Sequence, residues 1–559
     1  MASNDTAVAS LDAIVTDFLS TWSTTTTILL VTLLTILIYP LLTAKDPDVH
    51  PYILARQSTP SPIRHPGKSA VYRALDVPHS YPLKSGLGVK DANSPKWSPG
   101  RKGDVRDILR QAARGPEDQA GGGFDASKAG KLLTVLGSEK VVEKGIAEVT
   151  EQVNAVGWWL KKQEGVGRCA VYLSNSVELL VLVFAAAFYD FSVVLIPPAL
   201  AEEEVNSLLV QAKADVLVTE AGALNVDGAL GASSSIKTVV LVAKGSSGHM
   251  NFDEPTSESR AGKQVVMWNT LTDLAKAQGE STRDALPVDN ETSVKPLLTF
   301  VSNGSGYKLV EFTSDNLVAG ISGLNATVGR GQNIGPTDTL LPTTSLTDPY
   351  TLTWVLTGIF TSASIALNSV AGEDVDLEAT TASISPTILV SAPATIKNFL
   401  SNAIKSGLGP AGFRRFVQSN SLVAGNMPAK HAPAQFHPLS KVRLVLIGQP
   451  VWQKTRLTSE ELDELRLRLG ARIGYALTAP EVAGAVAQTN IQDYRNKGNV
   501  VSVGPPVGSV EIHMVGEEES VSSSTPQGKI VVRGPAVAGG NVELNGLARI
   551  AEDNTVSLV

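Results

Sequence analysis

The stretch TFVSNGSGYKLVEFTSDNL, residues 299–317, decides the fold. Its centre gathers small and hydroxyl residues with one lysine, namely Ser302, Gly304, Ser305, Gly306 and Lys308. Glycines let backbone N–H groups approach an anion, hydroxyls add donors, and lysine adds positive charge. A helix is predicted next, with Thr313 or Ser314 as its cap. The segment therefore predicts a phosphate-binding loop, although a plain turn before a helix would have the same composition.

The composition describes a large globular protein. Its 559 residues allow several domains, and 43% hydrophobic with 18% charged residues is typical of a folded chain. The net charge of −7 and the lack of a basic run predict no nucleic-acid partner. Cys169 is the only cysteine, so no intrachain disulfide can form, and the seven histidines have no metal-site spacing, which argues against a metal-hydrolase centre.

Residues 24–43 read TTTTILLVTLLTILIYPLLT and contain no charged side chain. About twenty such residues suffice to cross a bilayer core, so the sequence predicts one transmembrane helix. Acidic residues precede the segment and mostly basic ones follow it, which predicts a short lumenal tail over 1–23 and the bulk of the chain in the cytosol. Two alternatives stay open, a buried core helix and, because of Pro40, a hairpin within one leaflet. A membrane is thus an expected partner, most simply that of the endoplasmic reticulum or a lipid droplet.

The rest of the chain divides by composition and by the pattern of predicted strands, helices and turns into four segments. Residues 44–125 are rich in Pro, Gly and charge and are interpreted as an extension and linker. A first α/β subdomain is predicted over 126–340 and a second over 341–500. Short strands and turns over 501–559 predict a small β-rich subdomain.

Short apolar runs alternate with helical stretches in the two α/β segments. The predicted strands are 169–175, 215–220, 238–243, 387–392 and 442–448, and the predicted helices include 178–191, 201–214 and 458–470. In the last helix Thr458 and Glu461 fit a capping box and Gly470 ends it. Strands buried on both faces, with helices between them, predict parallel, helix-covered sheets.

The order of several segments resembles the adenylate-forming (AMP-binding) superfamily, and within it the long-chain acyl-CoA synthetases. The resemblance is carried by 158–198, 299–317, 341–350, 445–451 and 474–484. It implies an α/β fold, an adenylate-forming N-terminal domain with two helix-covered parallel sheets plus a small β-rich subdomain. The implied reaction activates a carboxylate with ATP and passes the acyl group to coenzyme A, with Mg²⁺ as the metal.

Family roles carry over to individual residues of this chain only in part. Ser302, Gly304, Ser305, Gly306 and Lys308 match the phosphate loop in kind, Tyr475 the aromatic that stacks on adenine, and Thr478 the phosphate-contacting threonine. Ala479 stands where the family has its Mg²⁺-binding glutamate, and Glu481 is the nearest replacement. A core aromatic at position 475 would fit the sequence equally well.

Three departures predict weakened chemistry. Aligned from Ser302, the loop is one residue short, with Tyr307 and Leu309 where Pro and Gly are expected. Gly546 has no aspartate after it to anchor ribose, and the chain ends at Val559, where the family would begin its lysine-bearing C-terminal domain. ATP or AMP and Mg²⁺ are thus weakened cofactors, and no catalytic residue is assigned.

Three hypotheses follow. The first is a membrane-anchored pseudoenzyme that acts as a binding or scaffold module in fatty acid or lipid metabolism, with a fatty acyl or acyl-CoA ligand and a protein partner. The second is a divergent long-chain fatty acid–CoA ligase with residual ATP-dependent acyl activation. The third is a purely structural membrane protein whose pocket has collapsed.

Overall fold

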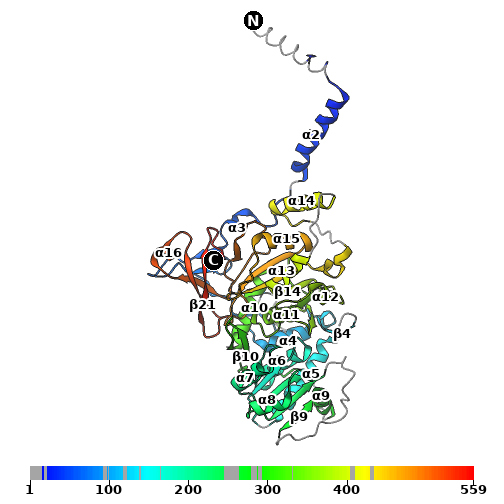
Figure 1. Cartoon of the computed structure of the whole chain (residues 1–559), viewed down its shortest axis with the longest axis vertical. Coiled ribbons are helices and arrows are strands. Elements are labelled where there is room, and N and C mark those ends of the chain that lie inside the picture. The colour runs from blue at the N-terminus through cyan, green and yellow to red at the C-terminus, as the bar shows by residue number, and fades with distance from the viewer. Residues whose placement is uncertain are drawn as a thin grey trace. The chain divides into compact units, whose positions relative to one another are not determined.

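The structure is a computed structural model, and Figure 1 shows the whole chain. It describes residues 16–17, 20, 22–43, 45–91, 97, 100–117, 123–136, 140–163, 165–243, 263–277, 286–287, 293–329, 331–402, 410–428 and 434–559. The chain divides into two compact units, Met1–His50 and Pro51–Val559.

The first unit contains helix α2, Thr24–Thr43, and most of the predicted 1–23 tail lies outside the described residues. Apolar side chains of α2 are exposed, namely Ile28, Leu29, Leu30, Val31, Leu33, Leu34, Ile36, Leu37 and Ile38. Within the described part of the chain, however, no helix has both the length and the apolar character needed to cross a membrane. The predicted transmembrane helix is therefore not supported.

The first sheet of the second unit has the order β11-β10-β6-β5-β7-β8-β9. All neighbours are parallel except β10 and β11, which form an antiparallel hairpin at one edge. The strands are β5 Arg168–Tyr172, β6 Ser192–Leu195, β7 Val216–Glu220, β8 Thr238–Val242, β9 Gln264–Met267, β10 Leu297–Ser302 and β11 Tyr307–Phe312. The predicted strands at 169–175, 215–220 and 238–243 are confirmed.

The helices associated with this sheet are α5 Ile146–Lys162, α6 Val177–Tyr189, α7 Glu202–Ala212, α8 Val226–Ala232 and α9 Trp268–Ala277. Helix α6 is apolar on nearly every side because it is buried almost throughout, and it packs on α5. The predicted helices at 178–191 and 201–214 are confirmed.

The second sheet has the order β17-β16-β15-β14-β12-β13-β3-β4 and is parallel from β16 to β3, with an antiparallel strand at each edge. Its strands are β3 Lys131–Leu136, β4 Lys140–Gly145, β12 Thr339–Pro342, β13 Ser364–Asn368, β14 Ile388–Ser391, β15 Leu444–Pro450, β16 Arg472–Thr478 and β17 Ala487–Gln488. The predicted strands at 387–392 and 442–448 are confirmed. β3 and β4 come from the segment assigned by sequence to the first subdomain.

Helices α10 Ser314–Thr327, α11 Pro349–Phe360, α12 Leu377–Thr381, α13 Pro393–Asn402, α14 Pro410–Val423 and α15 Ser459–Leu469 accompany this sheet, with the 3₁₀ segment η2 Ala434–Lys441. The caps follow the sequence prediction. Thr313 caps α10, and Thr458 with Glu461 forms a capping box on α15, which ends at Gly470 in the left-handed region at φ 58°.

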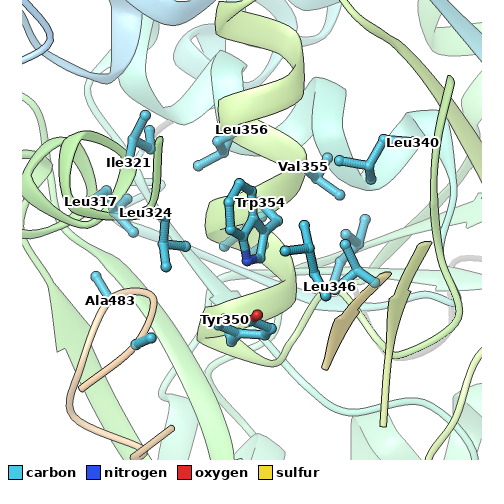
Figure 2. Close-up of a cluster of buried hydrophobic side chains, with 14 of the residues drawn as sticks. Leu317, Ile321, Leu324, Leu340, Leu346, Tyr350, Trp354, Val355, Leu356 and Ala483 are labelled. Carbon is cyan, nitrogen blue, oxygen red and sulfur yellow. The ribbon is translucent and has the colours of Figure 1, made fainter. Parts of the chain in front are cut away.

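Helix α11 forms the centre of the core beneath the sheet edge where the strands end. Figure 2 shows Trp354 and Tyr350 of α11 facing Leu317, Ile321 and Leu324 of α10. Trp354 is fully buried, and its ring packs edge-on against the Tyr350 ring, with 6.3 Å between the ring centroids. This packing holds the first turn of α11 in place.

The third sheet is mainly antiparallel, with the order β1-β2-β19-β20-β21-β22-β18. Its strands are β1 Ser58–Pro60, β2 Tyr72–Ala74, β18 Val501–Gly504, β19 Glu511–Val515, β20 Gln527–Arg533, β21 Asn541–Ile550 and β22 Val556–Leu558, with the short helix α16 Glu518–Ser522. The β-rich character predicted for 501–559 is confirmed.

The segment 44–125, interpreted from sequence as an extension and linker, carries structure of its own. It supplies β1 and β2 to the third sheet, helices α3 Pro51–Ala55 and α4 Val105–Arg114, and is followed by the 3₁₀ turn η1 Ala126–Lys128. Tyr72 pairs with Ile512, and Ile108 and Leu109 of α4 are fully buried in the main core. This segment is therefore part of the folded unit.

Candidate functional site

A cavity of about 300 Å³ lies at the carboxyl ends of the strands of the second sheet. Ser391 at the end of β14, Gly448 and Pro450 in β15 and Thr478 at the end of β16 line it, and the β10–β11 hairpin closes one side. Ligands of parallel α/β sheets bind at this edge as a rule. A side chain at Gly448 would come within 2.7 Å of the Tyr350 ring, so glycine is needed there.

The predicted phosphate loop is the turn of the β10–β11 hairpin. Ser302 pairs with Tyr307, and the Asn303 N–H donates to the Gly306 carbonyl at 3.1 Å. The Ser305 N–H and hydroxyl both donate to Asn303 Oδ1, at 3.1 and 3.0 Å. Most of the turn's hydrogen-bond donors are thus satisfied within the turn. This arrangement corresponds to the plain turn that the sequence left open as the alternative to a phosphate-binding loop.

Gly304 adopts a φ of +87°, which an L side chain rarely takes. A Cβ there would also meet the Trp452 side chain at 3.2 Å. The glycine therefore serves a tight turn against Trp452, and this requirement is independent of any phosphate.

Lys308 and Glu481, the residues assigned from sequence to phosphate and Mg²⁺, form an ion pair. Lys308 Nζ lies 2.5 Å from Glu481 Oε1. The lysine is about half exposed, and neither residue lines the cavity in the described part of the chain. Each residue neutralises the charge that the other would offer to a nucleotide or a metal.

Tyr475 and Thr478 lie in one strand but in different surroundings. Tyr475 is fully buried; its hydroxyl donates to Gln449 Oε1 at 2.6 Å and accepts from the Leu457 N–H at 3.1 Å, and burial raises the pKa of Tyr475. It is a core aromatic here, whereas Thr478 lines the cavity together with Ala479.

The region expected to anchor ribose takes another form. Gly546 lies within β21, where a Cβ would contact Val451 at 3.2 Å. Asp553, in the turn after β21, accepts hydrogen bonds from Lys497 Nζ and Arg495, both at 2.8 Å. The carboxylate nearest to the missing motif is therefore engaged in a structural ion network.

Sequence reasoning missed two carboxylates that line the cavity. Asp348 caps α11 and accepts from the Thr351 N–H at 3.0 Å and the Thr351 hydroxyl at 2.8 Å. Glu373, an exposed residue, accepts from Gln453 Nε2 at 3.2 Å. Burial raises the pKa of Asp348, while partial desolvation of the Glu373 carboxyl group and the charge of Asp348 raise the pKa of Glu373. Asp348-Pro349 was readable as a helix start, but nothing in the sequence pairs Asp348 with Glu373.

The cavity is acidic and partly aromatic. Among the described residues that line it, none is Lys, Arg or His. Phe300, Tyr307, Tyr350 and Trp452 provide aromatic surface. Burial, together with the charges of Glu204 and Glu373, raises the pKa of Tyr307.

These surroundings do not fit a bound magnesium nucleotide. Most donors of the turn are satisfied internally, the lysine is paired with the candidate Mg²⁺ ligand, and the described residues of the cavity wall include two carboxyl groups and no basic side chain. In the described ranges no group of three His, Cys, Asp or Glu side chains could hold a metal ion. We therefore derive no reaction step through ATP or Mg²⁺.

Known proteins share this architecture. An uncharacterized protein of Saccharomyces cerevisiae is 23% identical over 529 residues, covering 87% of this chain and 85% of that protein. A long-chain-fatty-acid–CoA ligase from Archaeoglobus fulgidus is similar in structure, with a TM-score of 0.55, 15% identity, and coverage of 85% of this chain and 86% of the ligase. The anthranilate CoA ligase AuaEII, solved with anthranoyl-AMP, has a TM-score of 0.56 at 14% identity and covers 84% of this chain and 79% of its own. At these identities the structures show a shared fold.

The family model described as AMP-binding enzyme matches residues 141–541, which is most of the chain and includes the whole first sheet, the second sheet except β3 and the start of β4, and the cavity. The expected resemblance is therefore confirmed: this chain belongs to the AMP-binding enzyme family.

Proposed function

We propose that this protein is a catalytically impaired member of its family that retains the cavity as a ligand-binding module in fatty acid or lipid metabolism. The observation that carries the proposal is that the predicted phosphate loop is already occupied, because the Asn303 and Ser305 N–H groups bond within the turn and Lys308 is paired with Glu481. Family catalysis would need both charges directed at a nucleotide, because positioned charge is the main source of rate in such reactions.

The ion pair is not by itself a strong barrier. Lys308 is about half exposed, and pairs of this kind contribute about 0–1 kcal/mol, so a ligand could displace it. The larger obstacle is that the turn has no free cradle and that Asp348 and Glu373 repel phosphate. A nucleotide would have to overcome both.

A titration of Mg·ATP into the full chain tests the proposal. Mg·ATP should not bind at physiological concentrations. Lys308→Ala should change any measured dissociation constant for Mg·ATP less than twofold. Micromolar binding that Lys308→Ala weakens tenfold or more would contradict the proposal, since it would show that the turn still acts as a phosphate loop.

A second candidate is a divergent fatty acid–CoA ligase with residual activity. The family match across 141–541 and the position of Thr478 on the cavity wall favour it. It requires the hairpin turn to open and present its N–H groups, which costs the hydrogen bonds made by Asn303. Carboxylate-dependent pyrophosphate exchange separates the two candidates.

Membrane attachment and a scaffold role remain part of the proposal. The exposed apolar side chains of α2 support a contact with lipid, because continuous apolar surface of this kind marks an interaction site. If α2 provides that contact, Leu29→Asp with Leu33→Asp should prevent flotation with liposomes. Unchanged flotation of this variant would remove α2 from the account.

A further inference from the structure

The cavity presents hydrogen-bond acceptors to a ligand. Asp348 and Glu373 contribute carboxyl oxygens, and Gln453 lies beside Glu373 on the wall. Gln453 is only 8% exposed, and within the described structure its Oε1 has no hydrogen-bond partner, although its Nε2 donates to Glu373. Because this oxygen has almost no accessible surface, the acceptors open to a ligand are the oxygens of the two carboxyl groups.

Several hydroxyl donors on the cavity wall are occupied. The Thr351 hydroxyl donates to Asp348, and the hydroxyls of Ser345 and Thr347 bond to each other at 2.9 Å. Lys308 is directed to Glu481, so its charge is already neutralised. A ligand carboxylate or phosphate would add acceptors and negative charge to a wall that already has both.

Aromatic rings complete the surface. Tyr307 and Trp452 are half-buried on the hairpin side, and Phe300 lies beneath them in β10. The faces of Trp and Tyr rings attract cations, and the attraction increases when water is excluded. Acceptors and aromatic rings around one cavity are the combination that recognises an organic ammonium group.

We propose that this cavity binds a small organic cation, an ammonium or amidinium group on an apolar body, in place of the family's carboxylate and nucleotide. The proposal rests on the proposed function, in which the cavity is retained for binding. A volume of about 300 Å³ is that of roughly ten water molecules at about 30 Å³ each, which leaves room for a small organic cation. A bare metal ion is disfavoured, since the described residues include no group of three metal-binding side chains.

Three probes of similar size and different charge test this: phenethylammonium, 2-phenylethanol and phenylacetate. Each is titrated into the full chain at neutral pH without nucleotide and followed by calorimetry. Phenethylammonium should bind at least tenfold more tightly than 2-phenylethanol, and phenylacetate should bind most weakly.

Matched variants locate the effect. Glu373→Gln removes one charge from the exposed wall while keeping its shape, and should weaken phenethylammonium about tenfold without affecting 2-phenylethanol. Glu378→Gln removes the same charge from exposed α12, outside the cavity lining, and should change affinity less than twofold. Asp348→Asn retains a residue that can cap α11 and should act like Glu373→Gln.

The outcomes are decisive in either direction. Phenylacetate binding as tightly as phenethylammonium, equal effects of Glu373→Gln and Glu378→Gln, or no binding of any probe at tens of millimolar would overturn the proposal. The proposed function is tested separately by an assay of pyrophosphate exchange, and detectable exchange would contradict it. The titration with the three probes does not measure that exchange. The proposal of a cation site and the proposal of lost catalytic activity can therefore be contradicted independently of each other.

Discussion

The core beneath the cavity and the rim around it differ in how tightly their side chains are packed. Below, Trp354 and Tyr350 of α11 are fully enclosed by α10 and the parallel strands (Figure 2). At the rim, Gly304 supports a closed turn and Lys308 is paired with Glu481. A dense core tolerates few changes in volume, whereas a rim residue can change at little cost in stability. The comparison teaches that the stability of this chain depends far more on its core than on the charges at the rim.

The largest expected effect lies in the core. Trp354→Ala removes a fully buried indole and should lower the free energy of unfolding by about 3–5 kcal/mol. Chemical denaturation would measure it, with the exposed Trp97→Ala as control, which should change stability by less than about 0.5 kcal/mol. A small effect at Trp354 would mean that this core contributes less to stability than its burial indicates.

A buried ion pair beside the second sheet comes next. Asp338 is nearly buried and accepts from Arg443 at 2.7 and 2.8 Å. Arg443→Leu leaves that carboxylate unpaired and should cost roughly 3 kcal/mol. Lys131→Met, which breaks the exposed pair with Glu143, should cost at most about 0.5 kcal/mol. Equal losses in both variants would contradict this difference.

Asp338 and a second buried carboxylate, Asp107 in α4, should make the stability of the protein depend on pH in the acid range. Burial alone would raise the pKa of Asp338 and Asp107, but hydrogen bonds from Arg443 and Arg101 outweigh it and lower both pKa values. A lowered folded-state pKa gives stability that is present above the unfolded value of about 3.9 and is lost as pH falls through the folded value. The melting temperature should therefore fall steeply below about pH 4, and Arg443→Leu should flatten that fall.

The smallest effects lie at the rim. Gly304→Val forces a side chain into φ +87° against Trp452 and should cost about 1–2 kcal/mol. Lys308→Ala should cost less than about 1 kcal/mol, because its partner stays accessible to water. Thermal unfolding of both would sharpen the comparison, and a loss at Lys308 as large as that at Trp354 would break it.

Local signals in the sequence predicted much of the fold. Helix α15 was predicted because Thr458, Glu461 and Gly470 act within a few residues of one another, and the buried strands were predicted because each is a continuous apolar run. Strand β2 was missed because three residues show no periodicity, and only its pairing with Ile512 makes Tyr72 part of a sheet.

The candidate site was less predictable because it depends on contacts between distant segments. The composition of 302–308 suits a loop or a turn, and only the hairpin pairing of Ser302 with Tyr307 decides between them. Asp348 and Glu373 face one cavity because α11 and β13 bring them back to the same sheet edge. Tyr475 matched a family motif, yet the side chain lies in the core, where its hydroxyl donates a hydrogen bond to Gln449.

The most direct test of the central claim is carboxylate-dependent ATP–pyrophosphate exchange by the full chain, measured with medium- and long-chain fatty acids and Mg²⁺. The closed turn, the Lys308–Glu481 pair and the acidic cavity predict exchange at background, and Glu481→Gln, which frees Lys308, should not restore it. Robust exchange that depends on Lys308 and on the fatty acid would contradict the account, because it would show that the rim still activates carboxylates.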